Sequence, residues 1–150
     1  MHMTIQTIDS GLIGFFKRWA VPTARFGIFV VFFWFGLLKV LGLSPAGPLV
    51  EALFDRTIHF MAFADFYIAF GIFEMLIGVL FLIRGLERVV LPLLLVHMIT
   101  TFGPLVFLPE ASWQRFMVPT LAGQYIIKNL VIVAAAMGIA AQLEPMRRTA

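Results

Sequence analysis

The sequence contains no cysteine among its 150 residues. Disulfide bonds, thiol relays and thiolate metal sites are therefore excluded, while the redox compartment of the protein stays open. Charged residues are also scarce, at 13% of the chain, and the formal net charge is only +3. So few charges lie outside the apolar segments that they cannot form a basic patch, and we expect no nucleic-acid partner.

Motifs that bind metals or cofactors are missing as well. Histidine occurs at His2 near the terminus, at His59 in a connection and at His97 in an apolar segment. This distribution gives no HExxH motif and no histidine pair that could ligate haem. There is also no phosphate-binding loop, nucleophile elbow or dinucleotide fingerprint. We predict no metal site and no intrinsic cofactor.

Apolar residues, by contrast, are abundant and occur in long blocks. They make up 61% of the chain, and the mean hydropathy is +1.00. A helix needs about 20 residues to cross the roughly 30 Å hydrocarbon core of a membrane. Blocks of that length, apolar nearly all round, occur at 26–43, 63–83, 89–108 and 121–141. We predict an all-α polytopic membrane protein, a four-transmembrane-helix bundle forming one domain over 1–150 in the lipid bilayer.

Lysine and arginine are distributed unequally between the two sides of this bundle. The two long connections, 44–62 and 109–120, contain only Arg56 and Arg115. The opposite side has seven basic residues: Lys17, Arg18, Arg25, Arg84, Arg88, Arg147 and Arg148. Because cytoplasmic loops are enriched in Lys and Arg, we expect both termini to be cytoplasmic. Residues 1–24 are then a cytoplasmic or interfacial segment.

The connections have predicted structure of their own. GLIGFFKRWA, at 11–20, has an apolar body and a basic tip, which favours a short helix in the membrane interface. The tight RGLER link makes the second and third spans a helical hairpin. Between Pro48 and His59, the spacing of Leu49, Leu53 and Phe54 predicts an amphipathic helix on the outer surface. PEASWQRFMVP, at 109–119, resembles an interfacial cap.

Ionisable residues inside the spans are costly, so their positions suggest a functional site. At about 1.5 Å per residue, Lys39 lies about 6 Å and Lys128 about 10 Å below the outer boundary, with Glu74 and His97 at about 16 Å. Asp65 lies near the end of its span and on the opposite side of the helix from Glu74. We therefore expect Asp65 to stay outside any site that the other residues form.

Helical spacing places small or hydroxyl residues on the same faces as these charges, and such faces pack against other helices. We predict that the polar faces converge on a buried cluster of Lys39, Glu74, His97, Thr100, Thr101, Gln124, Lys128 and Asn129. Two interpretations of this cluster remain open. It can accommodate an electron-rich ligand such as a quinone carbonyl, or an anion. Alternatively, Glu74 forms a structural ion pair with Lys39 or Lys128, and His97 only packs.

Several short motifs occur in an order typical of a known family. They are FGLLK at 35–39, GIFEMLIG at 71–78, the mid-span His97 and GQYIIKNLVI at 123–132. With these motifs the chain resembles the DoxX-like family of small four-helix integral membrane proteins, from about Arg25 to Gln142. The resemblance implies that the positions carried over from the family are Gly36, Lys39, Glu74, Lys128 and Asn129.

The resemblance also implies a class of function. Some relatives are subunits of membrane oxidoreductases, including a thiosulfate:quinone oxidoreductase, and many have no assigned activity. We therefore expect an accessory or quinone-interacting component of a redox system in the bacterial cytoplasmic (inner) membrane. A quinone, or a membrane or peripheral redox partner protein, would have to supply the redox chemistry. The alternative is a non-enzymatic membrane subunit or small permease whose charges are structural or handle a small ion or solute. No catalytic residue is assigned, and whether the chain is an enzyme stays open.

Overall fold

The computed structural model describes residues 2–145, of which 2–4 are described by backbone alone. Arg147 and Arg148, which contribute to the expected topology, lie outside the described residues. The elements, in chain order, are α1 (His2–Val40), α2 (Gly47–Thr57), α3 (Phe63–Leu82), α4 (Glu87–Phe102), α5 (Pro104–Phe107), α6 (Pro109–Ser112), β1 (Trp113–Arg115), β2 (Val118–Pro119), α7 (Leu121–Lys128) and α8 (Leu130–Ala140).

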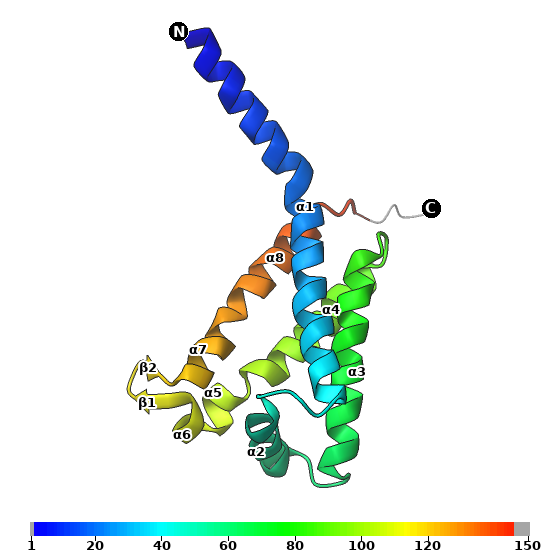
Figure 1. Ribbon diagram of the computed structural model, residues 1–150, viewed down its shortest axis with the longest axis vertical. Coiled ribbons are helices and arrows are strands. Elements are labelled where there is room, and N and C mark those ends of the chain that lie inside the picture. Colours follow the sequence, from blue (N-terminus) through cyan, green and yellow to red (C-terminus); the bar gives the residue numbers. More distant parts are fainter. Residues whose placement is uncertain (1, 146–150) are drawn as a thin grey trace.

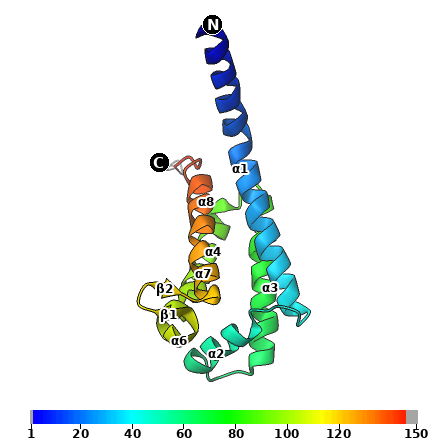
Figure 2. The same cartoon turned by 60° about the vertical axis from the view of Figure 1, so that its left-hand side comes forward.

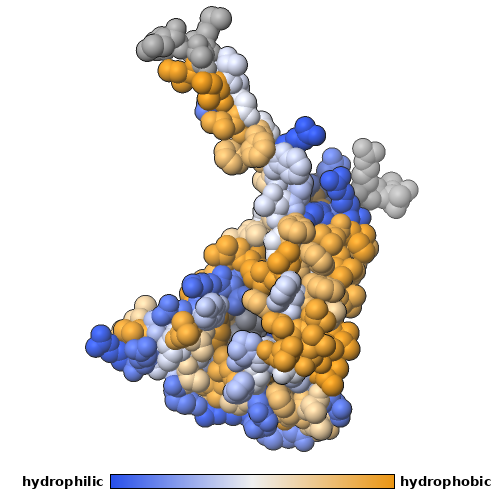
Figure 3. All heavy atoms as spheres, in the orientation of Figure 1, coloured by the Kyte–Doolittle hydropathy of each residue, from blue (hydrophilic) through white to orange (hydrophobic). Residues whose placement is uncertain are grey.

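Four helical segments are long and apolar enough to cross a membrane, which confirms the predicted class of all-α membrane protein. They are Ile5–Val40, Phe63–Leu82, Glu87–Phe107 and Leu121–Ala140. The third combines α4 with α5, and the fourth combines α7 with α8. Large apolar side chains such as Trp34, Ile72 and Ile99 are exposed on these helices, and hydrophobic residues cover much of the surface in Figure 3. Such a surface is compatible with lipid contact.

Helices α1 and α3 form the closest-packed pair, and glycine makes this possible. A Cβ atom at Gly36 would lie 2.5 Å from the carbonyl oxygen of Gly71, and one at Gly71 would lie 2.8 Å from that of Gly36. A Cβ at Gly78 would approach the backbone of Phe33 to 3.0 Å. Small residues let two backbones approach closely, so these glycines set the contact that runs along both helices in Figures 1 and 2.

The second packing region joins all four spans near the α3–α4 turn. Its fully buried side chains include Ile77, Phe81 and Leu94, and Ile139 of α8 packs among them. Nearby, the guanidinium of Arg25 pairs with the Glu87 carboxylate and donates to the Phe81 carbonyl oxygen at 3.1 Å. This core closes one end of the bundle, called the turn end below.

The N-terminal segment differs from the expected separate interfacial helix. Helix α1 is continuous over 39 residues and includes Pro22. It is about 58 Å long at 1.5 Å per residue, so its first half projects beyond the other helices and changes direction there (Figure 1). Proline removes one backbone hydrogen bond and bends a helix without necessarily ending it, which explains why the segment joins the span.

The opposite end of the bundle, called the α2 end below, carries the two long connections. The predicted amphipathic helix is confirmed as α2, which buries Phe54 against the rings of Phe63 and Phe66 at centroid distances of 5.5 and 4.9 Å. The second connection forms α6 and a two-stranded antiparallel ribbon, β1–β2, which the sequence did not indicate. A backbone φ of 60° at Met117 turns the chain between the strands.

Candidate ligand-binding site

Three buried ionisable side chains from three helices meet inside the bundle. The Lys39 ammonium on α1 donates to Oε2 of Glu74 on α3 at 2.6 Å, and Nε2 of His97 on α4 lies 2.9 Å from the other carboxylate oxygen, Oε1. All three residues are at most 6% exposed. The Glu74 carboxylate is therefore held between a cation and an imidazole, away from bulk water, and we call these residues the triad.

The local sequence explains how the first two members meet. Gly36 and Gly71 bring the backbones of α1 and α3 together, and Lys39 and Glu74 each follow their glycine by three residues, about one helical turn. A charged pair at this depth needs such close approach, because an ammonium and a carboxylate pair well only at hydrogen-bond distance. The packing of α1 on α3 thus fixes the ion pair.

His97 is oriented by threonines of its own helix. The Thr101 hydroxyl lies 3.0 Å from Nδ1 of His97 and also 3.0 Å from the His97 carbonyl oxygen, and Thr100 donates to that same carbonyl at 2.7 Å. A neutral imidazole donates from one ring nitrogen only, and an ionised carboxylate only accepts, so in this arrangement Nε2 donates to Glu74 and Nδ1 accepts from the Thr101 hydroxyl. The arrangement links Thr101, His97 and Glu74 in a continuous hydrogen-bonded chain.

Aromatic rings enclose the imidazole. Phe70 stacks on His97 at 5.0 Å with an interplanar angle of 8°, Phe73 stacks at 6.2 Å, and Phe32 contacts the ring edge-on at 5.1 Å. The Lys39 ammonium also lies 5.6 Å from the Phe70 centroid. These rings exclude water from the triad while leaving flat apolar surfaces beside it.

The Lys39 ammonium has donors to spare. Of its three N–H groups, one is used by Glu74, and the side chain makes no other hydrogen bond to the described residues. A buried donor without an acceptor costs free energy, so an acceptor atom that reaches the ammonium would bind to it favourably. The remaining N–H groups give the triad its capacity for a ligand.

The triad lies on the wall of a cavity of about 1030 Å³. Apolar side chains form most of the wall, and Leu49, Leu53 and Phe54 of α2 cover it at the α2 end. A hollow is visible between α1 and α7 in Figure 3. A cavity of this size, mostly apolar with a few convergent polar groups, is typical of sites for small organic ligands.

Comparison of the chain with protein-family models, curated proteins and solved structures finds no match. Within residues 2–145, no group of three or more His, Asp or Glu residues could hold a metal ion. The chemical groups of the site are an ion pair, an imidazole, two hydroxyls and aromatic rings.

The fourth span contributes less to the cluster than the sequence predicted. Lys128 and Asn129 line the cavity, but the Lys128 ammonium lies over the Tyr125 ring at 4.9 Å and the residue is exposed. The Asn129 amide donates to the backbone carbonyls of Tyr125 and Ile126, where α7 ends. Glu74 is therefore paired with Lys39 in the structure, one of the two partners that the sequence left open.

Gln124 does not join the cluster. It is exposed and does not line the cavity, because the cavity side of α7 is formed by Leu121, Ala122, Tyr125 and Ile126. The prediction placed this face of the fourth span against the triad, whereas α7, which carries Gln124, diverges from α1 (Figure 2). Asp65 is exposed, as expected from its helical phase.

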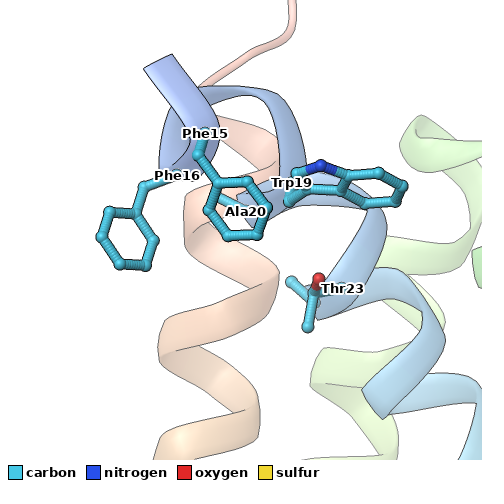
Figure 4. A pocket seen from close by; sticks show the side chains of 6 residues that line it. Phe15, Phe16, Trp19, Ala20 and Thr23 are labelled. Carbon is cyan, nitrogen blue, oxygen red and sulfur yellow. The ribbon is translucent and has the colours of Figure 1, made fainter. Parts of the chain in front are cut away.

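The cavity-lining aromatics were not part of the predicted site. Phe70 precedes Glu74 by one helical turn, so helical spacing could have placed it on the same face as the carboxylate. Phe73 directly precedes Glu74, and its spacing does not place it on that face. A second hollow, of about 600 Å³, lies on the projecting half of α1 (Figure 4). Its lining contains no ionisable group and consists of Phe15, Phe16, Trp19, Ala20, Thr23 and Ala24. This surface has no chemistry comparable to that of the triad.

Proposed function

We propose that this chain is a quinone-interacting component of a membrane redox system, in which the cavity receives a quinone-type ring and the triad binds its carbonyl. The finding that supports this most is the buried Lys39 ammonium, which has free N–H donors beside an apolar cavity lined with aromatic rings. A quinone has the matching chemistry, since it is flat, apolar and accepts hydrogen bonds at two carbonyl oxygens. The resemblance to the DoxX-like family is in keeping with this proposal.

The triad would also handle protons. Reduction of a quinone to a quinol takes up two electrons and two protons, which form two O–H bonds. The hydrogen-bonded chain from Thr101 through His97 to Glu74 can pass a proton toward a carbonyl held by Lys39. The electrons would come from a membrane or peripheral redox partner protein, because the side chains of the triad do not carry them.

We place the protein in the bacterial cytoplasmic membrane with both ends in the cytoplasm. The unequal distribution of basic residues supports this orientation. The turn end would then face the cytoplasm, and α2 with the β1–β2 ribbon would lie on the outer side. Because Glu74 and His97 are near the middle of their spans, the site would lie at membrane depth.

The test is direct binding of a ubiquinone or menaquinone analogue to the protein reconstituted in lipid nanodiscs. We expect saturable binding that weakens by about tenfold or more in Glu74→Gln and in His97→Ala, since each removes a charged or oriented partner of the site. Asp65→Asn is the matched control, because it removes an exposed carboxylate on the same helix. Absence of saturable binding, or equal binding by all variants, would overturn the proposal.

A small permease is a second candidate, favoured by one observation. Lys128 adds a second cation to the cavity wall, and Tyr125 is its only described side-chain partner. A cavity with two lysines and one carboxylate would attract a small anion. Uptake of a small organic anion into protein-containing vesicles, lost in Lys128→Ala, would support this candidate, whereas uptake no faster than in empty vesicles would exclude it.

A further inference from the structure

The cavity is closed unevenly around its circumference. Helix α1 packs along α3, and the core near the turn end joins α1 to α8. Toward the α2 end, α7 diverges from α1, and both views show this separation (Figures 1 and 2). The hollow in Figure 3 lies in the same place, so the cavity opens sideways between α1 and α7.

Several cavity-lining residues are also exposed, including Val96 and Thr100 on α4, and one group of them lies on the two sides of the gap between α1 and α7. Phe35 on α1 is 53% exposed, and across the gap Leu121 and Tyr125 on α7 are 69% and 62% exposed. Lys128, also exposed, lies one turn from Tyr125 on the same helix. We call these residues, Phe35, Leu121, Tyr125 and Lys128, the lateral opening.

The lateral opening lies at the depth of lipid chains. Phe35 precedes the end of α1 by five residues, or about 7.5 Å, and Lys128 follows the start of α7 by seven residues, or about 10 Å. Both positions are inside the spans, and their neighbours Trp34 and Val131 are exposed apolar residues. At the α2 end, the cavity is lined by Leu49, Leu53 and the buried Phe54, together with the exposed Pro45 and Thr57.

We infer that the ligand of the triad is a lipid-soluble molecule with a long apolar chain, which enters from the bilayer through the lateral opening. Its ring reaches the triad, and its chain lies between Phe35 and Tyr125. This inference rests on the proposed function and adds the class of ligand and its route. Because the opening is continuous with the cavity and lined on both sides by apolar rings, it matches an apolar chain and not a water-soluble molecule.

Lys128 adds a cation to the opening. Its ammonium, held over the Tyr125 ring, is placed where the electron-rich head of an entering molecule passes before it reaches Lys39. The chain of the bound molecule then remains in contact with lipid, so the opening need not close for the ring to bind.

The absence of cysteine makes a site-specific test available. Phe35→Cys and Trp34→Cys each introduce the only thiol of the chain, and both positions are exposed, but Trp34 does not line the cavity. Each variant is reacted in nanodiscs with a bulky methanethiosulfonate reagent that reductant removes. Binding is then measured for two quinone analogues with the same ring, one with a decyl chain and one with a methyl group.

We expect the label at position 35 to weaken binding of the decyl analogue by at least about tenfold, while the methyl analogue changes by less than about twofold, because the label occupies the space of the chain. The label at position 34 should change neither, and reductant should restore binding. A second pair of variants tests the same point without a label. Ala122→Phe, which adds a ring to the cavity wall, should weaken binding of the decyl analogue more than binding of the methyl analogue. Ala134→Phe, exposed on α8 outside the cavity, should change neither.

The possible failures are distinguishable. If the unlabelled protein binds neither analogue, the proposed function fails and the inference fails with it. If the methyl analogue binds and the decyl analogue is insensitive to the label at position 35 and to Ala122→Phe, the inference alone is overturned. Equal effects of labels at positions 34 and 35 would also overturn it, since they would point to general disturbance of α1.

Discussion

Lys39 and Glu74, separated by 35 residues in the sequence, form a 2.6 Å ion pair between α1 and α3. Both side chains are almost fully buried, at 7% and 8% exposure. Removing two charges from water costs several kcal/mol per ion, and such a pair is often no more stable than two apolar residues of similar size. The pair need not add to stability, and its contribution to stability and to ligand binding can be measured separately.

The first prediction concerns this pair. Lys39→Met alone should lower the free energy of unfolding by about 3–5 kcal/mol, because it leaves a buried carboxylate without its cation. The double variant Lys39→Met/Glu74→Met should recover most of this loss, as measured by thermal unfolding in detergent. Quinone-analogue binding should be absent from both. If the double variant binds the analogue as the wild type does, the pair is only structural.

The second prediction concerns the glycine contact between α1 and α3. Gly36→Ala should destabilise the bundle by about 1–3 kcal/mol, since the new methyl group would lie 2.5 Å from a backbone oxygen that cannot rotate away. Gly27→Ala, on the same helix with nothing within 4 Å, should be neutral or stabilising by up to about 1 kcal/mol. Equal melting temperatures for the two variants would show that the close contact does not form.

The third prediction concerns the turn end. Arg25 joins α1 to the start of α4 through Glu87 and to the end of α3 through the Phe81 carbonyl. Arg25→Met should therefore destabilise the protein by about 3 kcal/mol, because Glu87 would remain buried without a cation. Arg18→Met, which removes an exposed charge from the same helix, is the control. Thermal unfolding that is the same for both variants would contradict this role.

The fourth prediction compares two contacts that hold α2 over the cavity. Arg56 pairs with Glu110 at 2.7 Å, but both side chains are more than half exposed, so Arg56→Met should cost at most about 1 kcal/mol. Phe54 is buried against two rings, so Phe54→Ala should cost about 3–5 kcal/mol and increase hydrogen exchange throughout α2. Faster exchange in Arg56→Met than in Phe54→Ala would reverse this order.

Much of the fold followed from the sequence because the membrane imposes simple constraints. Apolar blocks of membrane-spanning length have to be helical, since backbone groups in lipid must be hydrogen-bonded within their own segment. The amphipathic spacing of Leu49, Leu53 and Phe54 likewise predicted α2. The β1–β2 ribbon and the long continuous α1 were missed, because the first depends on a short-range turn at Met117 and the second on how far proline bends a helix.

The sequence likewise predicted part of the candidate site and missed part of it. Charge, depth and helical phase were sufficient to group Lys39, Glu74 and His97, because ionisable residues in lipid must face one another. The same criteria could not choose between Lys39 and Lys128 as the partner of Glu74, since both lie at similar depth. They also assigned Gln124 to the cluster, although it is exposed and does not line the cavity.

The sequence by itself determined the class of protein, the four apolar spans and the set of ionisable residues from which a buried site could form, because hydrophobicity and the cost of buried charge act locally on each helix. Only the tertiary structure decided which lysine meets Glu74, that aromatic rings enclose His97, and that the cavity opens between Phe35 and Tyr125. These features depend on the closeness of α1 to α3 and on the divergence of α7, which arise from contacts between helices far apart in the chain.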